Sequence, residues 1–510
     1  MSVARTWAVA LSGLRGDLVE VEADVTSHQP DFKIIGLADK ALGEAVRRVS
    51  NACENSGLAL PYRRLTVNLS PAGLPKQGAS FDVGIAVAAL ATDARLDPAS
   101  VGGTVHIGEL GLDGRLRPVP GILPAVRAAV AHGHTRVVVP WANRDEAALV
   151  AGADVRGAVS LAQVAAWHGA DLEAPDVPPV AGPAAAVAPR AEESLDLAEI
   201  VGQREAVDAL VVAAAGGHHM LMSGPPGAGK TMLARRLPGI LPPLDDEAAL
   251  EVASLRSLAG ERVVRLDRRP PFEAPHHSAS TAALVGGGSK AVRPGAIARA
   301  SRGVLFVDEA TEAASSTLDA LRQPLEQGRI DIHRAGFSAR FPARFQLVLA
   351  MNPCPCGEYG VRGGACTCSA HVVRRYAQRL SGPLLDRIDI DVRLERIASI
   401  AAAETGERTT SAEARVAVLA ARERARSRLE GTPWRINAEV TGTWLRQGAQ
   451  APDPAARRSL DAALQRGLLT LRGYDRVLRV AWTIADLAGR ERPDAVDVGR
   501  ALFLKKGVSA

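Results

Sequence analysis

The sequence is poor in aromatic residues and has no long hydrophobic run. Phenylalanine, tyrosine and tryptophan make up 4% of the 510 residues, so alanine, valine and leucine must fill the cores. No stretch approaches the ~20 consecutive apolar residues that a transmembrane helix needs, so we expect no membrane partner. The first residues, MSVARTWAVALSGLRGD, lack a long apolar core and a clean cleavage site, which predicts a protein of the cytoplasm.

Cysteine is also scarce, and neither sign of charge dominates. Of the 5 cysteines, four lie between positions 354 and 368, which does not fit the disulfide framework of a small secreted domain. The formal net charge is +5 and the isoelectric point about 9.1. This mildly basic balance permits binding to nucleic acid without requiring it.

The length predicts about three domains, at roughly 100–200 residues each. We expect a first domain over residues 1–172, because short apolar strand-like runs (64–69 and 136–140) alternate there with helix-like runs (81–92 and 121–132). A proline- and alanine-rich stretch without periodicity predicts a linker over 173–194. A nucleotide-binding domain over 195–395 and a helical domain over 396–510, with helices near 411–430 and 472–489, complete the expected organisation.

The most informative stretch fits the pattern G-x-x-x-x-G-K-S/T of a phosphate-binding loop. It consists of Gly224, Pro225, Pro226, Gly227, Ala228, Gly229, Lys230 and Thr231. Glycines let successive backbone N–H groups point inward at phosphates, Lys230 supplies a positive charge, and the Thr231 hydroxyl is a ligand for Mg²⁺. The apolar run 219–222 before it predicts the strand that leads into the loop, and a helix should begin near Lys230.

A second apolar run, 303–307, ends in Asp308 and Glu309. In this position Asp308 is expected to hold the Mg²⁺, and Glu309 to polarise the attacking water. The two motifs together predict binding of ATP with Mg²⁺ and either its hydrolysis or an ATP-driven switch.

Three further segments resemble the AAA+ class of ATPases. Asn352 follows a third apolar run, 346–351, and fits the sensor 1 position that orients the attacking water. The segment 380–389 resembles the one that carries an arginine finger, which implies that Arg387 reaches the ATP of a neighbouring subunit; a planar, permanently charged guanidinium suits that role. The segment 471–478 resembles the sensor 2 helix, with Arg472 the better match and Arg476 the alternative.

The resemblance narrows further at APHHSASTAALVGGG (274–288), Arg293-Pro294-Gly295 and LRQPLE (321–326), which look like the magnesium-chelatase clade. With the N-terminal region, the chain resembles the YifB/ComM family of magnesium-chelatase-like ATPases over its whole length. The resemblance implies a cytoplasmic ring, usually a hexamer, that acts on single-stranded or branched DNA as a branch-migration helicase in recombination or natural transformation. His276 and His277 also admit a metal site, but adjacent side chains point apart, so a structural or pore-loop role is favoured.

The N-terminal region resembles the Lon protease domain at residues 75–80 and 108–115, with Ser80 at the nucleophile position. A serine needs a base to react at neutral pH. The segment that should supply a lysine has Leu123, Ala125 and Arg127 instead, and Lys76 falls in the wrong motif. We therefore expect a non-catalytic domain. The expected fold class is α/β: an AAA+ P-loop core with an N-terminal Lon-protease-like α+β domain and a C-terminal helical domain.

Cys354, Cys356, Cys366 and Cys368 form two C-x-C pairs in a glycine-rich segment after Asn352. Four thiolates complete a tetrahedral Zn²⁺ site, which we favour over four reduced free thiols. A metal there is expected to brace the segment that links Asn352 to Arg387.

Two basic segments are candidates for contact with DNA phosphates. Residues 255–299 carry many cations, and 329–344 reads as a hairpin with its turn at 335–336. A ring of such insertions is expected to follow phosphates without reading sequence, although a solvated charged face is the simpler interpretation for most of these residues. The candidates are Arg256, Arg262, Arg265, Arg268, Arg269, Lys290, Arg293, Arg299, Arg329, His333, Arg334, Arg340 and Arg344. The arginines of helix 412–429 fit solvent or a subunit interface as well as DNA.

Two other functions compete with a DNA motor. A chelatase-type ATPase that remodels a protein or metal-insertion partner fits the ATPase core, but the N-terminal domain argues against it. A regulator that uses ATP only for assembly is disfavoured by the intact Lys230, Asp308, Glu309 and Arg387.

Overall fold

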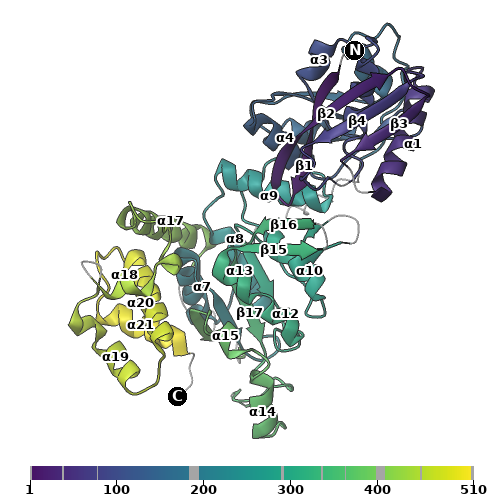
Figure 1. The fold of residues 1–510 in the computed structure, drawn as a ribbon. Helices are drawn as coiled ribbons and strands as arrows, with labels where there is room; N and C mark the ends of the chain where they lie inside the picture. The colour runs from purple at the N-terminus through teal and green to yellow at the C-terminus, as the bar shows by residue number, and fades with distance from the viewer. Residues whose placement is uncertain are drawn as a thin grey trace.

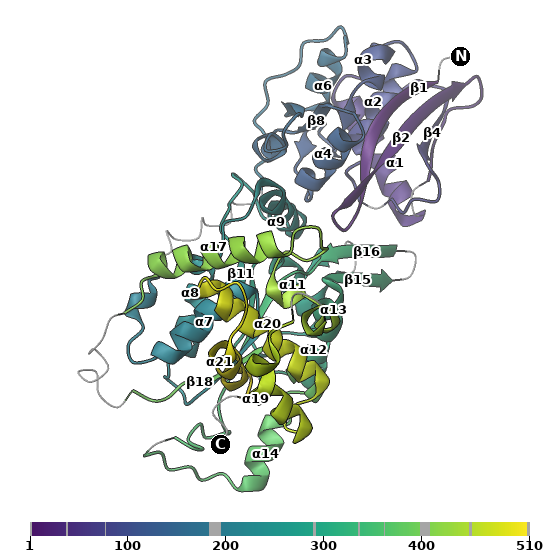
Figure 2. The ribbon, with the colours of Figure 1, turned by 90° about the vertical axis from the view of Figure 1, so that its left-hand side faces the viewer.

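The chain forms an N-terminal domain, a nucleotide-binding domain and a group of C-terminal helices, as the computed structural model in Figure 1 shows. The structure describes residues 3–36, 39–76, 78–182, 195–288, 292–334, 337–361, 363–397, 408–447 and 451–506. Among these residues, no helix is both long and apolar enough to cross a bilayer. The N-terminal domain lies at one end of the molecule, and the C-terminal helices lie beside the nucleotide-binding domain (Figures 1 and 2).

The N-terminal domain is a mixed seven-stranded sheet with helices packed on it, in the order β3-β4-β2-β1-β5-β8-β9. Alternating buried and partly exposed residues along its strands explain why one face of the sheet forms a core with the apolar helix α2. The strands are β1 (Ala4–Ser12), β2 (Arg15–Thr26), β3 (Asp31–Ile35), β4 (Arg64–Ser70), β5 (Val105–His106), β8 (Arg136–Pro140) and β9 (Asp154–Ala158), and a separate two-stranded ribbon is formed by β6 (Glu109–Leu110) and β7 (Leu116–Arg117). The helices are α1 (Asp39–Asn55), α2 (Asp82–Ala91), α3 (Pro98–Gly102), α4 (Ile122–Ala131), α5 (Arg144–Ala147) and α6 (Leu161–Trp167).

The nucleotide-binding domain is built on a five-stranded parallel sheet in the order β11-β14-β17-β10-β18. Its central strands are apolar and fully buried, which is typical of a parallel sheet covered on both faces. The strands are β10 (Met220–Ser223), β11 (Phe272–Glu273), β14 (Val304–Val307), β17 (Gln346–Met351) and β18 (Ile390–Arg393). The main helices are α7 (Arg204–Gly216), α8 (Lys230–Ile240), α9 (Asp246–Ala259), α12 (Ser315–Asp319), α13 (Arg322–Gln327), α14 (Ala370–Ala377) and α15 (Gly382–Leu385).

Smaller elements form the insertions of this domain. They are α10 (Thr281–Val285), β12 (Gly286–Gly287), β13 (Arg293–Pro294), α11 (Ala296–Arg299), and the antiparallel hairpin of β15 (Arg329–Arg334) and β16 (Phe337–Pro342). The hairpin predicted for 329–344 is thereby confirmed, whereas its predicted turn at 335–336 and Lys290 lie outside the described residues.

The C-terminal helices pack against α7 and α8 and share one core with one face of the parallel sheet, around the buried Trp482. They are α17 (Ser411–Arg428), α18 (Gly442–Arg446), α19 (Pro454–Gln465), α20 (Leu471–Leu487) and α21 (Ala495–Lys506). The predicted α/β fold class, with its P-loop core and C-terminal helical domain, is confirmed. The predicted domain boundaries stay predictions; residues 173–182 have no helix or strand, and 183–194 of the predicted linker lie outside the described residues.

Helix α9 and the loop after it join the nucleotide-binding domain to the N-terminal domain. The N–H of Gly121, at the start of α4, donates to the carbonyl of Ser257 in α9 at 3.0 Å. Apolar residues of α4 and α9, with Val263 beyond α9, share one buried cluster. The two domains are therefore connected by packed side chains as well as by the chain itself.

Candidate functional site

The P-loop lies between the carboxyl end of β10 and the start of α8, as predicted. Gly227 and Gly229 have φ angles of +76° and +93°, a conformation that glycine adopts without a steric penalty. Lys230 follows Gly229 and is the first residue of α8. Its side chain is buried, and its Nζ donates to the carbonyls of Gly224 (2.7 Å) and Pro225 (3.0 Å). Burial lowers the pKa of Lys230, and the nearby carboxylates of Asp308 and Glu309 act in the opposite direction.

The structure brings the predicted Mg²⁺ ligands together. The Thr231 hydroxyl donates to Oδ2 of Asp308 at 2.7 Å, and this bond joins the first turn of α8 to the end of β14. The N–H of Glu309 donates to the other oxygen of Asp308 at 2.9 Å. Hard oxygen ligands of this kind suit Mg²⁺, which retains several waters and also binds substrate phosphates.

Asn352 lies beside the same lysine. Its Oδ1 accepts a hydrogen bond from Lys230 Nζ at 3.1 Å, directly after β17. Since β10, β14 and β17 are parallel, their carboxyl ends meet at one edge of the sheet. Lys230, Thr231, Asp308, Glu309 and Asn352 therefore gather at this edge, as the sequence predicts.

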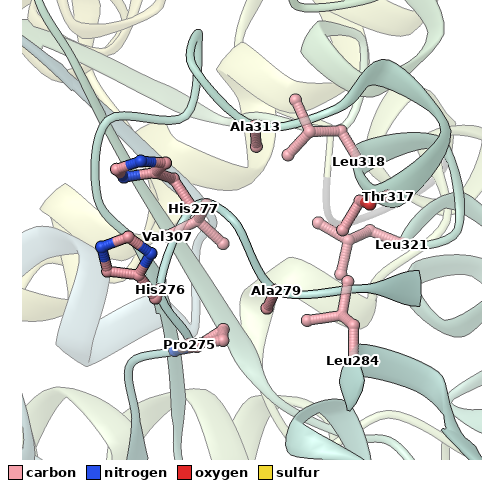
Figure 3. Close-up of a pocket in the computed structure, with 10 residues that line it drawn as sticks. All are labelled: Pro275, His276, His277, Ala279, Leu284, Val307, Ala313, Thr317, Leu318 and Leu321. Atoms are coloured by element: carbon pink, nitrogen blue, oxygen red, sulfur yellow. The ribbon is translucent and has the colours of Figure 1, made fainter. Parts of the chain in front are cut away.

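His277 is a site residue that sequence reasoning did not place. Its Nδ1 lies 3.0 Å from Oε2 of Glu309, and its ring is tilted against that of His276, with centroids 4.1 Å apart. Figure 3 shows the two rings together at a small pocket whose far side is apolar. The pocket is lined by Pro275, His276, His277, Ala279, Leu284, Val307, Ala313, Thr317, Leu318 and Leu321. The spacing of the two histidines after β11 gave no signal of this contact, because it depends on how β11 and β14 pair.

The three predicted arginines lie at the opposite edge of the sheet. Arg387 precedes β18, and β18 runs parallel to β10 with Ile390 opposite Met220. The carbonyl of Arg387 accepts from Arg476 at 3.0 Å, and Arg472 lies 3.9 Å from the carboxylate of Asp386. All three therefore lie near the amino ends of the strands, whereas the P-loop of the same chain lies beyond their carboxyl ends.

The two sensor 2 candidates differ in their surroundings. Arg476 pairs with the buried carboxylate of Asp389, and this guanidinium is the main cause that holds the pKa of Asp389 low against the effect of burial. Arg472 is 77% exposed. Arg387 itself is mostly buried and contacts Glu326 and the carbonyl of Pro383; burial and then its arginine neighbours lower its pKa.

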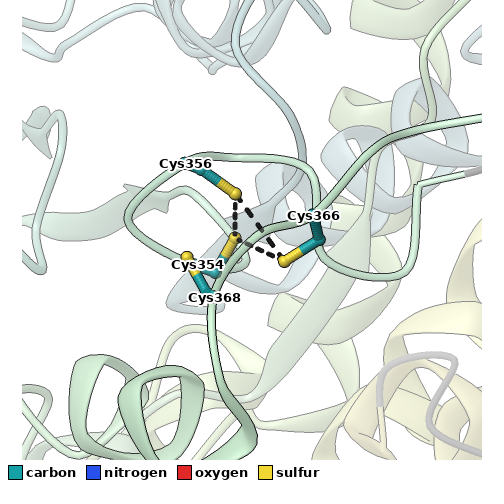
Figure 4. A group of neighbouring side chains, drawn as sticks. All are labelled: Cys354, Cys356, Cys366 and Cys368. Atoms are coloured by element: carbon teal, nitrogen blue, oxygen red, sulfur yellow. Dashed lines mark hydrogen bonds between the residues drawn. The ribbon is translucent and has the colours of Figure 1, made fainter.

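The four clustered cysteines also come together, in the loop between β17 and α14 (Figure 4). The Sγ atom of Cys354 lies 3.2 Å from that of Cys356 and 3.8 Å from that of Cys366, and Cys356 and Cys366 are 3.6 Å apart. With Cys368, all four sulfurs lie within 4.8 Å of one another. The group is compatible with a metal ion such as zinc.

The Lon-like segment has no base at the predicted position. Leu123 and Ala125 are buried, and Arg127 lies 3.8 Å from Glu247. Lys76 is buried, and its Nζ donates to backbone carbonyls, those of Pro71 and Leu74. This arrangement favours a structural role for the segment that contains Ser80.

Many of the arginines considered as DNA contacts are paired with carboxylates. Arg340 and Arg329 both contact Asp331 within the hairpin, at 2.7 and 3.1 Å. Other pairs in these segments are Arg262 with Asp145, Arg268 with Asp246, and Arg299 with Glu273. These pairs favour the simpler interpretation of a charged surface, and binding of these arginines to DNA phosphates requires the pairs to open.

The prediction for the arginines of helix α17 was wrong for three of them. We expected them to face solvent, a subunit interface or DNA, but three bind within the chain. Arg422 donates to the carbonyl of Ala214 in α7, and Arg424 to that of Asp486 in α20. Arg428 pairs with the buried Asp486 carboxylate. The helix uses these residues to attach the C-terminal helices to α7, which composition alone did not reveal.

Comparison with known proteins agrees with this geometry. Successive parts of the chain match the families described as subunit ChlI of Mg-chelatase (residues 21–143), magnesium chelatase, subunit ChlI (196–402), and magnesium chelatase, subunit ChlI C-terminal (408–505). An uncharacterized protein of Mycobacterium tuberculosis is 48% identical over 99% of both chains. Competence protein ComM of Haemophilus influenzae is 40% identical over 96% of this chain and 95% of its own, and the uncharacterized protein YifB of Escherichia coli is 38% identical over 100% of this chain and 97% of its own. The chain therefore belongs to the YifB/ComM family of magnesium-chelatase-like AAA+ ATPases.

Proposed function

We propose that this chain is an ATP-hydrolysing ring motor that moves branched DNA. Family membership indicates ATPase activity, with ATP and Mg²⁺ as cofactors. The observation that carries the proposal further is the separation of Arg387 from the P-loop of its own chain, at opposite edges of one sheet. An arginine in this place can complete an ATP site only on a neighbouring subunit, so the motor is a ring, and we propose a hexamer.

The roles within the shared site follow from the contacts. Lys230 binds the β- and γ-phosphates, Thr231 and Asp308 hold Mg²⁺, and Asn352 orients the attacking water that Glu309 polarises. The hydrogen bonds that Lys230 makes to the Gly224 and Pro225 carbonyls are exchanged for phosphate oxygens when ATP binds. The Arg387 that reaches this γ-phosphate belongs to the neighbouring subunit, and it must first break its ion pair with Glu326. The exposed Arg472 of that subunit adds a second positive charge beside it.

DNA as the substrate is supported by the relationship to a competence protein and by the basic hairpin of β15 and β16. The hairpin extends beside the N-terminal domain, where the Ser12 hydroxyl contacts the carbonyl of Ser338 (Figure 2). Phosphate contacts release counterions, so binding should weaken steeply with salt and depend little on sequence. Neutralising Arg334 and Arg340 should reduce DNA-stimulated ATP turnover and leave ATP binding intact.

The test is ATP-dependent migration of a synthetic branched junction, with ATP turnover measured in the presence of single-stranded, duplex and branched DNA. We expect branched DNA to stimulate turnover and the junction to move, and Glu309→Gln to bind ATP without moving it. An ATPase that neither binds nor remodels any of these DNAs would contradict the proposal.

That outcome would favour the second candidate, a chelatase-type ATPase that remodels a protein or metal-insertion partner. The observation in its favour is that all three matched family descriptions refer to the magnesium-chelatase subunit. Zinc, the third cofactor that the sequence predicts, is proposed for the four cysteines as a structural ion that takes no part in phosphoryl transfer.

A further inference from the structure

The cysteine loop contacts the P-loop directly. A Cβ atom added to Gly357, the residue after Cys356, would lie 2.4 Å from Cδ and 2.9 Å from Cγ of Pro226. The backbone of the cysteine loop therefore lies against a proline ring of the phosphate-binding loop. A second connection exists at the start of the loop, because Cys354 comes two residues after Asn352, which accepts from Lys230.

The sulfur atoms have the spacing of a tetrahedral zinc site. Zn–S bonds of about 2.3 Å place the sulfurs of a regular tetrahedron about 3.8 Å apart. The Sγ–Sγ distances among Cys354, Cys356 and Cys366, which are 3.2, 3.8 and 3.6 Å, lie close to this value. A backbone N–H group also points at the cluster, since that of Tyr359 donates to Sγ of Cys354 at 3.3 Å. Such N–H donors stabilise thiolates that bind a metal.

The loop has little secondary structure or apolar core of its own. Cys354 is buried, but Cys356 is exposed, and Cys366 and Cys368 are only partly buried. The described residues from 353 to 369 contain no helix or strand and include the glycines at 357, 360, 363 and 364. A glycine-rich segment with few apolar side chains has a high conformational entropy to lose, and a tetrahedral metal site supplies folding free energy to such segments.

The far side of the loop is attached to the sheet. Arg393 at the end of β18 donates to the carbonyl of Gly360 at 2.7 Å, and Arg396 pairs with Glu358 at 2.6 Å. The loop thus lies between β18 on one side and Pro226 on the other. Ordering it fixes the position of Gly357 against the P-loop.

We infer that Cys354, Cys356, Cys366 and Cys368 hold one zinc ion whose function is to keep Gly357 against Pro226, so that ATP affinity depends on the metal. The inference rests on the proposed ATP site, and it assigns the zinc a role in positioning the P-loop. Without the metal, the cysteine loop loses its fixed shape and the P-loop loses the surface that lies against Pro226.

The chain offers substitutions that separate metal binding from contact with the P-loop. Cys356→Ser removes one ligand. Gly357→Ala keeps all four ligands but places a methyl group against Pro226. Gly363→Ala is the matched control, since Gly363 lies in the same loop with a similar φ of +72° against +79° for Gly357. Among the described residues other than its chain neighbours, no atom lies within 4 Å of a Cβ added there.

The experiment measures zinc content by elemental analysis and binding of a fluorescent ATP analogue, on full-length protein purified without a histidine tag. We expect one zinc per chain in the wild type, Gly357→Ala and Gly363→Ala, and less than a tenth of that in Cys356→Ser. ATP-analogue affinity should fall at least tenfold in Cys356→Ser and in Gly357→Ala and stay within twofold of the wild type in Gly363→Ala.

Wild-type protein without zinc would overturn the inference, and so would wild-type affinity in Cys356→Ser after its zinc is lost. Equal losses of affinity in Gly357→Ala and Gly363→Ala would also overturn it, because backbone strain and not contact with Pro226 would then be the cause. Failure of the proposed ATP site itself looks different, since wild-type protein loaded with zinc would then not bind the analogue.

Discussion

His277 Nδ1 lies 3.0 Å from the carboxylate of Glu309, so a side chain from the segment after β11 contacts the residue proposed to polarise the attacking water. A carboxylate engaged by an imidazole accepts a proton from water less readily. Both side chains are partly exposed, and pairs of this kind are worth about 0.2–1 kcal/mol. We therefore expect His277→Ala to raise basal ATP turnover by about 1.4–5-fold, the rate equivalent of that energy, without changing ATP binding.

Steady-state ATPase assays with His276→Ala as the control test this expectation. His276 contacts the Ser278 hydroxyl at 2.7 Å and shares the pocket with His277. Among the described ion pairs, the histidine that contacts Glu309 is His277. A fall in turnover for His277→Ala, as large as that for Glu309→Gln, would show instead that His277 holds Glu309 in its working position.

Turnover between subunits is tested by mixing two inactive variants. Lys230→Ala should abolish ATP binding, and Arg387→Ala should bind ATP and lose about 10³–10⁵-fold in turnover, the usual range for an arginine finger. A mixed ring contains some interfaces with both Lys230 and Arg387, so we expect partial recovery of ATPase activity. Rings of mixed subunits, verified by mass, that stay inactive at every ratio would contradict the proposal that Arg387 acts on a neighbour.

The positions of the P-loop residues, Asp308 and Asn352 could be predicted from the sequence because the signals are local, while their roles toward ATP and Mg²⁺ stay predictions. Gly227 and Gly229 adopt positive φ angles that the loop requires, and Asp308 and Asn352 each follow a buried strand, so parallel pairing brings them together. The contact of His277 with Glu309 and that of Gly357 with Pro226 could not be predicted in this way. Both depend on how separate loops pack after the sheet has formed.

The same limit explains the correction to helix α17. Its arginines are spread around the helix, so their spacing does not follow the face that Ala414, Val418, Ala421 and Ala425 bury, and the helix has few large apolar residues. The structure shows that Arg422 and Arg428 are attached to backbone and carboxylate groups of α7 and α20. A long arginine side chain can serve a buried acceptor as well as solvent, and only the position of the partner decides between them.

We expect substitutions of Arg472 and Arg476 to have different effects on the free energy of unfolding. Arg476→Ala leaves the carboxylate of Asp389 buried without its main partner, which typically costs about 3–5 kcal/mol. Arg472→Ala removes an exposed side chain that lies 3.9 Å from Asp386, so its stability should change little while ATP turnover falls. Chemical denaturation beside ATPase assays measures both effects. A stable Arg476→Ala variant with lost turnover would assign the sensor 2 role to Arg476 instead.

The N-terminal domain contains a buried chain of hydrogen bonds that should respond to pH. The Thr6 hydroxyl donates to backbone carbonyls, so its oxygen accepts from Nδ1 of His106 at 2.7 Å. Nε2 of His106 is then the acceptor for Nε2–H of His168 at 2.9 Å, and Nδ1 of His168 accepts from Ser100 at 2.8 Å. With both rings neutral, these tautomers satisfy every ring nitrogen in the network.

With His168 in this tautomer, a proton added to Nε2 of His106 would place two N–H groups against each other in a buried site. Burial, and then the neighbouring His168, lower the pKa of His106 from 6.5 to about 3, and burial lowers that of His168. The unfolded chain therefore binds more protons than the folded one between these values. The stability from the neutral pair is fully present above the unfolded pKa of 6.5 and is lost as pH falls toward 3, with a slope of at most about 1.4 kcal/mol per pH unit for each histidine.

We expect His106→Gln to lower the thermal unfolding midpoint at neutral pH and to flatten its decline between about pH 6.5 and pH 4, because the unfolded chain then has one fewer group that gains a proton. His28→Gln is the control, since His28 is exposed and contacts only the Thr26 hydroxyl at 3.3 Å in the described hydrogen bonds. Its midpoint should follow that of the wild type at every pH. Equal slopes for wild type and His106→Gln would mean that His106 carries a proton in the folded protein, and the assignment of two neutral rings would be wrong.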